Sequence, residues 1–79
     1  MKVKAELTDT YCGEANYSWV RRIELNVPEL LSEKAIVRRV KKELGLSGLR
    51  FKRRDNFGDS LALWGLNGDC VVLFINFEF

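Results

Sequence analysis

The 79 residues contain no histidine, and this absence limits the chemistry available to the chain. Histidine is the commonest general base near neutral pH and the commonest ligand of transition metals. With two cysteines, Cys12 and Cys70, one chain lacks the ligands for a Cys/His zinc site and has no histidine to activate a nucleophile. Phosphate-binding glycine loops, dinucleotide motifs and nucleophile elbows are also missing from the sequence. We therefore predict a protein that is not an enzyme and that uses no metal and no cofactor.

Two acids, Asp55 and Asp59, flank Gly58 in a segment that can bind a divalent cation. The sequence around them lacks the further oxygen ligands of a calcium loop. Turns closed by Asx hydrogen bonds use the same residue types, and we favour a turn over a metal site.

Charge is sorted along the chain. Residues 34–54 hold nine of the thirteen Lys and Arg residues and one acid, Glu43, so this stretch carries a charge of +8. The remaining four basic residues and ten acids give −6, which brings the net charge to +2. One surface is therefore expected to be basic and another acidic. The basic residues expected to face outward are Lys34, Arg38, Arg39, Lys41, Lys42, Arg50, Lys52 and Arg54.

A basic surface of this kind has three interpretations. It can follow a nucleic-acid backbone, because neutralised phosphates release counterions, or it can dock on an acidic protein patch. An ordinary amphipathic helix with a solvated polar face has the same pattern. Phe51 is the one aromatic residue of this stretch, and its alternation places it inward. This argues against an aromatic platform for single-stranded RNA.

Residues 8–17 mix polar side chains with two tyrosines and lead directly into Trp19, a composition that recognition loops use. The alternative is that Asp9 and Asn16 make the hydrogen bonds of a turn, with Tyr17 and Trp19 in the core. If the chain binds a partner, aromatic residues are expected to supply the buried anchors, because they dominate interface hot spots. The candidate anchors are Tyr11, Trp19 and Trp64.

The elements that position these residues follow from hydrophobic periodicity. Alternation predicts a strand over residues 2–8 and another over 17–27, joined by a loop over 8–16. In the second strand, Tyr17 is expected to share a face with Ile23. The helix and the later elements are expected at 32–44 (helix, N-cap Ser32, followed by Gly45), 49–54 (strand), 55–59 (loop), 60–66 (strand), 67–68 (Asn-Gly turn) and 70–79 (strand).

This order, β-β-α-β-β-β, predicts a single α+β domain over residues 1–79, with a mainly antiparallel five-stranded sheet and one helix packed on one face. The last two strands are apolar on both faces, and one helix cannot cover both sides of the sheet. An apolar patch around Trp64 and Phe74 is therefore expected to form a homodimer or partner interface. The alternative is that the sheet curls and covers this patch with the first hairpin.

No apolar run approaches the roughly 20 residues of a membrane span. Residues 1–6 lack the apolar segment of a secretory signal. The expectation from these two observations is a cytoplasmic protein without a membrane partner.

Three stretches resemble small proteins of phages and mobile elements: residues 8–22 (T-D-T-Y-x-G-E-A-N-Y-x-W-V-R-R), 35–39 (A-I-V-R-R) and 71–75 (V-V-L-F-I). Many such proteins are counter-defence factors, and some are anti-CRISPRs. The resemblance implies a compact inhibitor that occludes a surface of a nucleoprotein complex in the cytoplasm of the host cell. Many anti-CRISPRs are acidic DNA mimics, and the basic stretch of this chain departs from that pattern. The resemblance transfers no functional residues.

Our leading hypothesis is therefore a non-catalytic phage protein, an anti-CRISPR-like inhibitor that acts by protein–protein interaction with a protein or ribonucleoprotein complex of the host. Its basic residues would dock an acidic patch or contact a nucleic-acid backbone. The alternative is a regulatory domain that binds nucleic acid directly through the basic helix 32–44 and strand 49–54.

Overall fold

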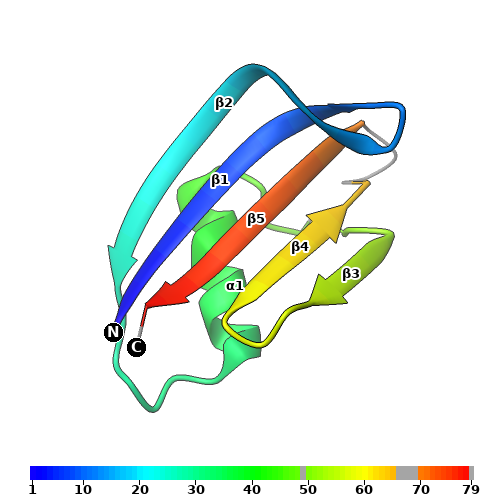
Figure 1. Ribbon diagram of the computed structural model, residues 1–79. Coiled ribbons are helices and arrows are strands. Elements are labelled where there is room, and N and C mark those ends of the chain that lie inside the picture. Colours follow the sequence, from blue (N-terminus) through cyan, green and yellow to red (C-terminus); the bar gives the residue numbers. More distant parts are fainter. Residues whose placement is uncertain (49, 66–69, 79) are drawn as a thin grey trace.

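The computed structural model describes residues 1–48, 50–65 and 70–78. A five-stranded antiparallel sheet in the order β2-β1-β5-β4-β3 carries one helix on one of its faces (Figure 1). The predicted α+β architecture is thus confirmed. Among the described residues, no helix has the length and apolar character needed to cross a membrane. The elements are β1 (Lys2–Tyr11), β2 (Glu14–Asn26), α1 (Glu33–Glu43), β3 (Arg53–Asn56), β4 (Ser60–Trp64) and β5 (Val71–Glu78).

Helix α1 begins and ends where capping residues predict. The Ser32 side chain accepts a hydrogen bond of 3.2 Å from the backbone N–H of Ala35, which satisfies one of the free amides of the first turn. Leu44 closes the last turn, and Gly45 follows with a φ of +74°, a left-handed conformation that glycine adopts without strain. The helix prediction is confirmed.

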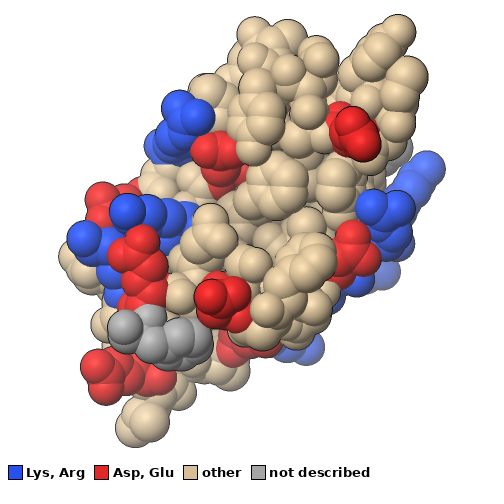
Figure 2. All heavy atoms as spheres, in the orientation of Figure 1, with Lys and Arg blue, Asp and Glu red and all other residues tan. Residues whose placement is uncertain are grey.

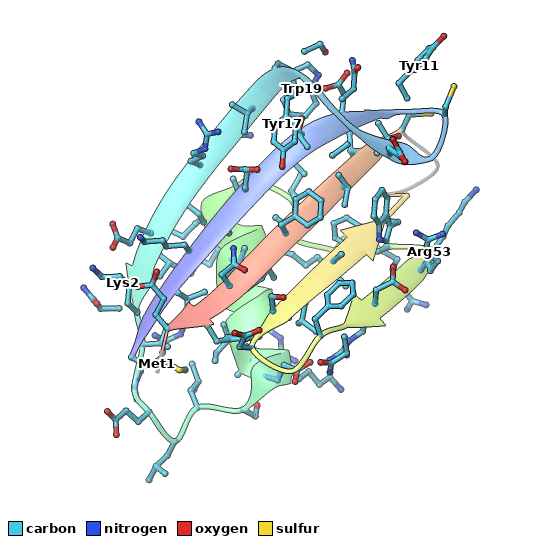
Figure 3. The ribbon with its side chains drawn as sticks, in the orientation of Figure 1. Met1, Lys2, Tyr11, Tyr17, Trp19 and Arg53 are labelled. Carbon is cyan, nitrogen blue, oxygen red and sulfur yellow. The ribbon has the colours of Figure 1, made fainter. Side chains whose placement is uncertain are left out.

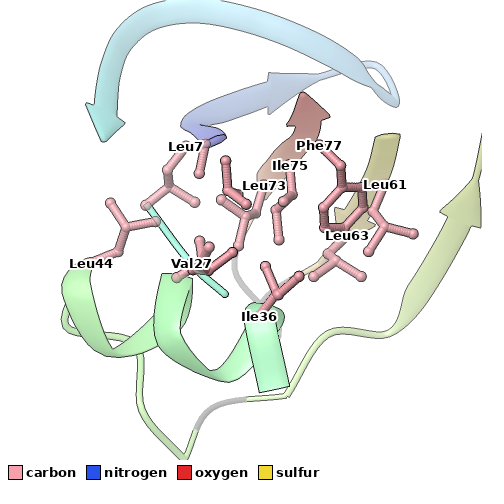
Figure 4. Close-up of a cluster of buried hydrophobic side chains, with 12 residues drawn as sticks. Leu7, Val27, Ile36, Leu44, Leu61, Leu63, Leu73, Ile75 and Phe77 are labelled. Carbon is pink, nitrogen blue, oxygen red and sulfur yellow. The ribbon is translucent and has the colours of Figure 1, made fainter. Parts of the chain in front are cut away.

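The core lies between α1 and one face of the sheet, which we call the helix face (Figure 4). Alternate residues of β1, β4 and β5 supply the sheet side of the core, and the apolar stripe of α1 supplies the other. The opposite side of the sheet, which we call the open face, has no helix over it among the described elements (Figure 1). The buried core residues are Val3, Ala5, Leu7, Val27, Ile36, Val40, Leu44, Leu61, Leu63, Leu73, Ile75 and Phe77.

The predicted loop over residues 8–16 is wrong. Strand β1 continues to Tyr11 and pairs there with Glu14, so the turn consists of Cys12 and Gly13 alone. Both turn residues have positive φ, +53° and +80°, as a type I′ hairpin turn requires. The segment reads as a loop because its polar residues belong to a hairpin arm that extends past the core, where burial no longer imposes alternation.

A bulge in β2 overturns the prediction that Tyr17 shares a face with Ile23. The register passes from Thr8–Val20 to Thr10–Ala15, so β2 carries extra residues at this point. Tyr17 has a φ of +56°, and its side chain bonds to Glu6, which lies on the open face. The bulge resets the alternation, and hydrophobic periodicity does not reveal such a reset.

Strand β3 also differs from the prediction. It begins at Arg53, near the end of the predicted strand 49–54, and it includes Asp55 and Asn56, which were expected in a loop. It pairs with β4 along its four residues and needs little apolar pattern because it is an edge strand. The predicted Asn-Gly turn at 67–68 lies outside the described residues.

Candidate functional site

Helix α1 has its apolar residues on one side and most of its basic residues on another side. Its apolar stripe includes Ile36 and Val40, which are buried, while Lys34, Arg38 and Lys42 recur every four residues on an exposed side. At 1.5 Å per residue, these three cations follow about 12 Å of the helix axis. We call the four helix cations Lys34, Arg38, Lys41 and Lys42 the basic face. Arg50 and Lys52 are also exposed, on the segment that follows the helix.

A hollow of about 490 Å³ lies along this part of the helix. Cations line it from the helix, Val37 forms an apolar wall, and Ser47 and Gly48 of the following segment close the other side. The ammonium group of Lys41 also lies 5.9 Å from the ring centre of Phe51, which is partly buried against the core as predicted. The lining cations are Lys34, Arg38, Lys41 and Lys42.

Charges on the open face are paired within the sheet. Lys2 lies 2.9 Å from Glu24, Lys4 lies 3.2 Å from Glu78, and Arg22 lies 2.8 Å from Glu6. By contrast, Lys34, Arg38, Arg39, Lys42, Arg50 and Lys52 form no ion pair with another described residue. These six cations are therefore not balanced by a direct ion pair with a described acid, although Glu43 lies near Arg39 and Lys42.

Arg54 stands apart from the other predicted basic residues. Its guanidinium forms an ion pair with Glu33 in the first turn of α1, so its charge is already balanced. Arg53, which we did not predict as a site residue, lies on the open face, 4.8 Å from the ring centre of Trp64 and 3.4 Å from the carboxylate of Asp55. The sequence does not reveal that Arg53 and Arg54 lie on opposite faces of the sheet in this order. The register of β3 with β4 determines which of the two arginines faces the helix.

The patch predicted around Trp64 and Phe74 exists, and it is largely packed. The two rings meet edge to face at 6.0 Å, and Trp64 Nε1 donates a 3.0 Å hydrogen bond to Asp55 Oδ2. Ala62 and Val72 of the same face are 1% and 0% exposed. Figure 2 shows a broad uncharged area here with charged side chains at its margins. An interface through this patch stays a prediction.

The aromatic anchors are dispersed. Tyr11 is 71% exposed near the tip of the first hairpin, and Trp19 is 42% exposed on the same hairpin arm (Figure 3). Trp64 lies on the open face, across the sheet from α1. The structure therefore brings most of the predicted cations together along α1 and does not bring the predicted aromatic anchors to them.

Asp9 forms the hydrogen bond with Asn16 that the alternative interpretation of residues 8–17 expects, and it also organises the bulge of β2. Its carboxylate accepts hydrogen bonds from the Ser18 hydroxyl at 2.5 Å, from Asn16 Nδ2 at 2.9 Å and from the Ser18 backbone N–H at 3.0 Å. The Ser18 hydroxyl bond, and after it the Asn16 bond, hold the pKa of Asp9 well below its usual value. Asn16 and Ser18 lie on β2, on the other side of the hairpin from Asp9, and the bulge brings both of them to its carboxylate.

Tyr17 and Arg22 both act on Glu6. The Tyr17 hydroxyl bonds to the Glu6 carboxylate, and this bond, with the Arg22 ion pair, lowers the pKa of Glu6. Glu6 in turn raises the pKa of Tyr17. These residues form a polar cluster on the open face beside the uncharged area.

Arg21 interrupts the apolar alternation of β2, and the structure explains why. It lies on the helix face opposite Leu7, and its Nη1 donates a 3.1 Å hydrogen bond to the backbone carbonyl of Leu44. A cation at this position stabilises the negative end of the helix dipole. This hydrogen bond links the C-terminal end of α1, which carries Lys41 and Lys42, to strand β2 of the sheet.

No metal-binding cluster of three or more His, Cys, Asp or Glu residues occurs in the described ranges. Asp55, one of the two acids weighed as a cation ligand, is engaged by Trp64 and Arg53. Cys12 and Cys70 are both exposed free thiols.

Comparison of the chain with protein-family models, with curated proteins and with solved structures finds no match.

Proposed function

We propose that this chain is a non-catalytic binding protein that docks the basic face of α1 on an anionic surface of a host nucleoprotein complex and blocks that complex stoichiometrically. The observation that carries the proposal is the segregation of charge. Three cations of the basic face, Lys34, Arg38 and Lys42, form no ion pair among the described residues, and the same holds for Arg50 and Lys52 of the following segment. By contrast, the acids Glu6, Glu24 and Glu78 of the open face are ion-paired.

Physical chemistry supports a docking role for such a surface. Unpaired cations held on a rigid helix raise the association rate with an anionic partner and fix its orientation. The kind of partner, a defence complex of the anti-CRISPR type, comes from the resemblance to phage counter-defence proteins. The sequence contains no histidine, the commonest general base near neutral pH. Inhibition by occlusion needs no such base, and this favours occlusion over inhibition by bond cleavage.

Direct nucleic-acid binding is a second candidate, and the hollow beside α1 favours it. Four cations line that hollow, and Ser47 and Gly48 border it on the other side. If four phosphates are neutralised there, log K should fall against log salt with a slope of about −3.6 on duplex DNA and about −2.8 on a single strand.

The test uses a purified RNA-guided effector complex and bare duplex DNA in parallel. The proposal expects binding to the complex at a fixed stoichiometry, loss of its target binding, and no comparable affinity for bare duplex. Arg38→Glu with Lys42→Glu should abolish this binding. The matched control is Lys2→Glu with Lys4→Glu, which changes net charge equally at residues that are ion-paired on the open face.

Inhibition that survives the Arg38 and Lys42 reversals would overturn the proposal. Tight binding to bare duplex with a slope near −3.6 would favour the second candidate instead. Equal losses in both double variants would show that net charge, rather than the basic face, controls binding.

A further inference from the structure

The two edges of the sheet differ in how well they are protected. Strand β3 forms one edge with four residues, three of them charged, which is a common defence against edge-to-edge pairing. Strand β2 forms the other edge with thirteen residues, and no described element lies outside it (Figure 1). Its bulge ends before Val20, so residues 20–26 form a regular strand with one unpaired side.

The hydrogen bonds at the start of β1 show which backbone groups of β2 are unpaired. Met1 and Val27 exchange two bonds of 2.9 Å, one from each backbone nitrogen to the other carbonyl. Bonded and non-bonded pairs alternate along an antiparallel ladder. Residues 21, 23 and 25 therefore direct their backbone groups to β1. The residues that direct theirs to the free edge are Val20, Arg22, Glu24 and Asn26.

A second copy of this edge can pair with the first in a limited set of registers. Two-fold antiparallel pairing that matches outward groups with outward groups, and that uses at least five of residues 20–26 in each copy, can be centred on residue 22, 23 or 24. Centring on Arg22 places two arginines opposite each other, and centring on Glu24 places two glutamates opposite each other. Both arrangements are destabilising. Centring on Ile23 places Arg22 of each copy opposite Glu24 of the other, so charge selects one register.

The existing ion pairs extend this complementarity. Glu24 pairs laterally with Lys4 in the sheet register and bonds to Lys2, while Arg22 bonds to Glu6. In the Ile23-centred register, four charged side chains would lie in one row across the open face. Lys4 and Glu24 of the first copy would be followed by Arg22 and Glu6 of the second copy. Positive and negative charges alternate along this row. On the helix face, the partly exposed Ile23 would meet its own counterpart.

We infer that the protein forms a two-fold dimer by antiparallel pairing of residues 20–26 of β2 with the same residues of a second copy, centred on Ile23. The two sheets become one continuous sheet, and the outward backbone groups of Val20, Arg22, Glu24 and Asn26 gain partners. Arg21 points inward from this edge, a position that often discourages pairing. Here the Leu44 carbonyl accepts a bond from its guanidinium, which keeps the side chain against the helix. This inference does not depend on the proposed function.

A pair of charge reversals tests the register. Arg22→Glu places two glutamate pairs across the axis, and Glu24→Arg places two arginine pairs there, so each variant alone should dimerise at least about 30-fold more weakly than the parent. A mixture of the two variants restores opposite charges at both positions and should form a one-to-one heterodimer. Sedimentation velocity and native mass spectrometry measure both results, and circular dichroism checks that each variant is folded.

Lys34→Glu is the matched control for Arg22→Glu, because both lower the net charge by about 2 and Lys34 lies on α1, away from the edge. It should dimerise like the parent. A parent chain that stays monomeric up to millimolar concentration overturns the inference. So does a dimer that survives both single reversals, or a mixture of the two folded variants that stays monomeric while the parent is dimeric.

Discussion

Replacing Arg21 by methionine should lower the free energy of unfolding more than replacing Arg22, the other cation of β2. The substitution keeps the apolar stem of the side chain and removes the guanidinium that bonds to the Leu44 carbonyl at 3.1 Å. A hydrogen bond to a charged group contributes about 1.5–3 kcal/mol, and part of this is recovered when water reaches the carbonyl. We expect a loss of about 1–2 kcal/mol in the free energy of unfolding, or roughly 5–15 °C in Tm for a domain of this size.

Arg22→Met is the matched control for this prediction. Arg22 is the next residue, and its partner Glu6 is reached on the open face, where a solvent-exposed ion pair contributes about 0.2–1 kcal/mol. Urea unfolding at low protein concentration measures both variants as monomers. Amide exchange should be faster at the C-terminal turn of α1 in Arg21→Met alone. If Arg22→Met costs as much as Arg21→Met, the assigned role of the helix-end hydrogen bond is wrong.

Three further substitutions have defined outcomes. Hydrogen bonds lower the pKa of Asp9 from 3.8, so its ionised carboxylate stabilises the fold above that pH, and this stabilisation is lost progressively as the pH falls below it. Asparagine does not titrate, so Tm measured from pH 5 to pH 2 should fall less in Asp9→Asn than in the parent. Gly13→Ala meets no atom within 4 Å, so its cost, about 1 kcal/mol in urea unfolding, should come from the φ of +80° alone, and a neutral result would contradict the observed turn. Trp64→Glu should leave the sedimentation profile unchanged if β2 forms the dimer, whereas a monomer would favour the patch at Trp64 and Phe74.

The sequence predicts the parts of this fold that burial controls. The helix has a regular apolar stripe, a serine cap and a following glycine, and its bounds are correct to one residue at each end. In the core strand β1, apolar Val3, Ala5 and Leu7 on the helix face alternate with polar residues on the open face. In α1 and in the first part of β1, apolar residues face the core and polar residues face away from it, so the periodicity identifies both elements.

Prediction fails where pairing, rather than burial, determines structure. The hairpin arm around Cys12 and the edge strand β3 are polar, so their sequences resemble loops although their backbones form ladders. The bulge beside Asp9 places Tyr17 on the face opposite Ile23, and it is held by hydrogen bonds of Asp9 to Asn16 and Ser18 across the hairpin. The basic face was predictable because helical spacing defines it, whereas the pairing of Arg54 with Glu33 depends on where β3 begins.

The edge pairing has a consequence for the basic face that connects the two proposals. Residues opposite each other across an antiparallel ladder lie on the same face of the sheet, so a dimer centred on Ile23 carries both copies of α1 on one side. Two linked binding surfaces raise affinity only for a partner long enough to meet both. Arg22→Glu should therefore weaken binding to an extended anionic partner and leave binding to a short one unchanged, whereas Arg38→Glu with Lys42→Glu should weaken both. An equal loss for short and long partners in Arg22→Glu would show that the edge residue contacts the partner itself.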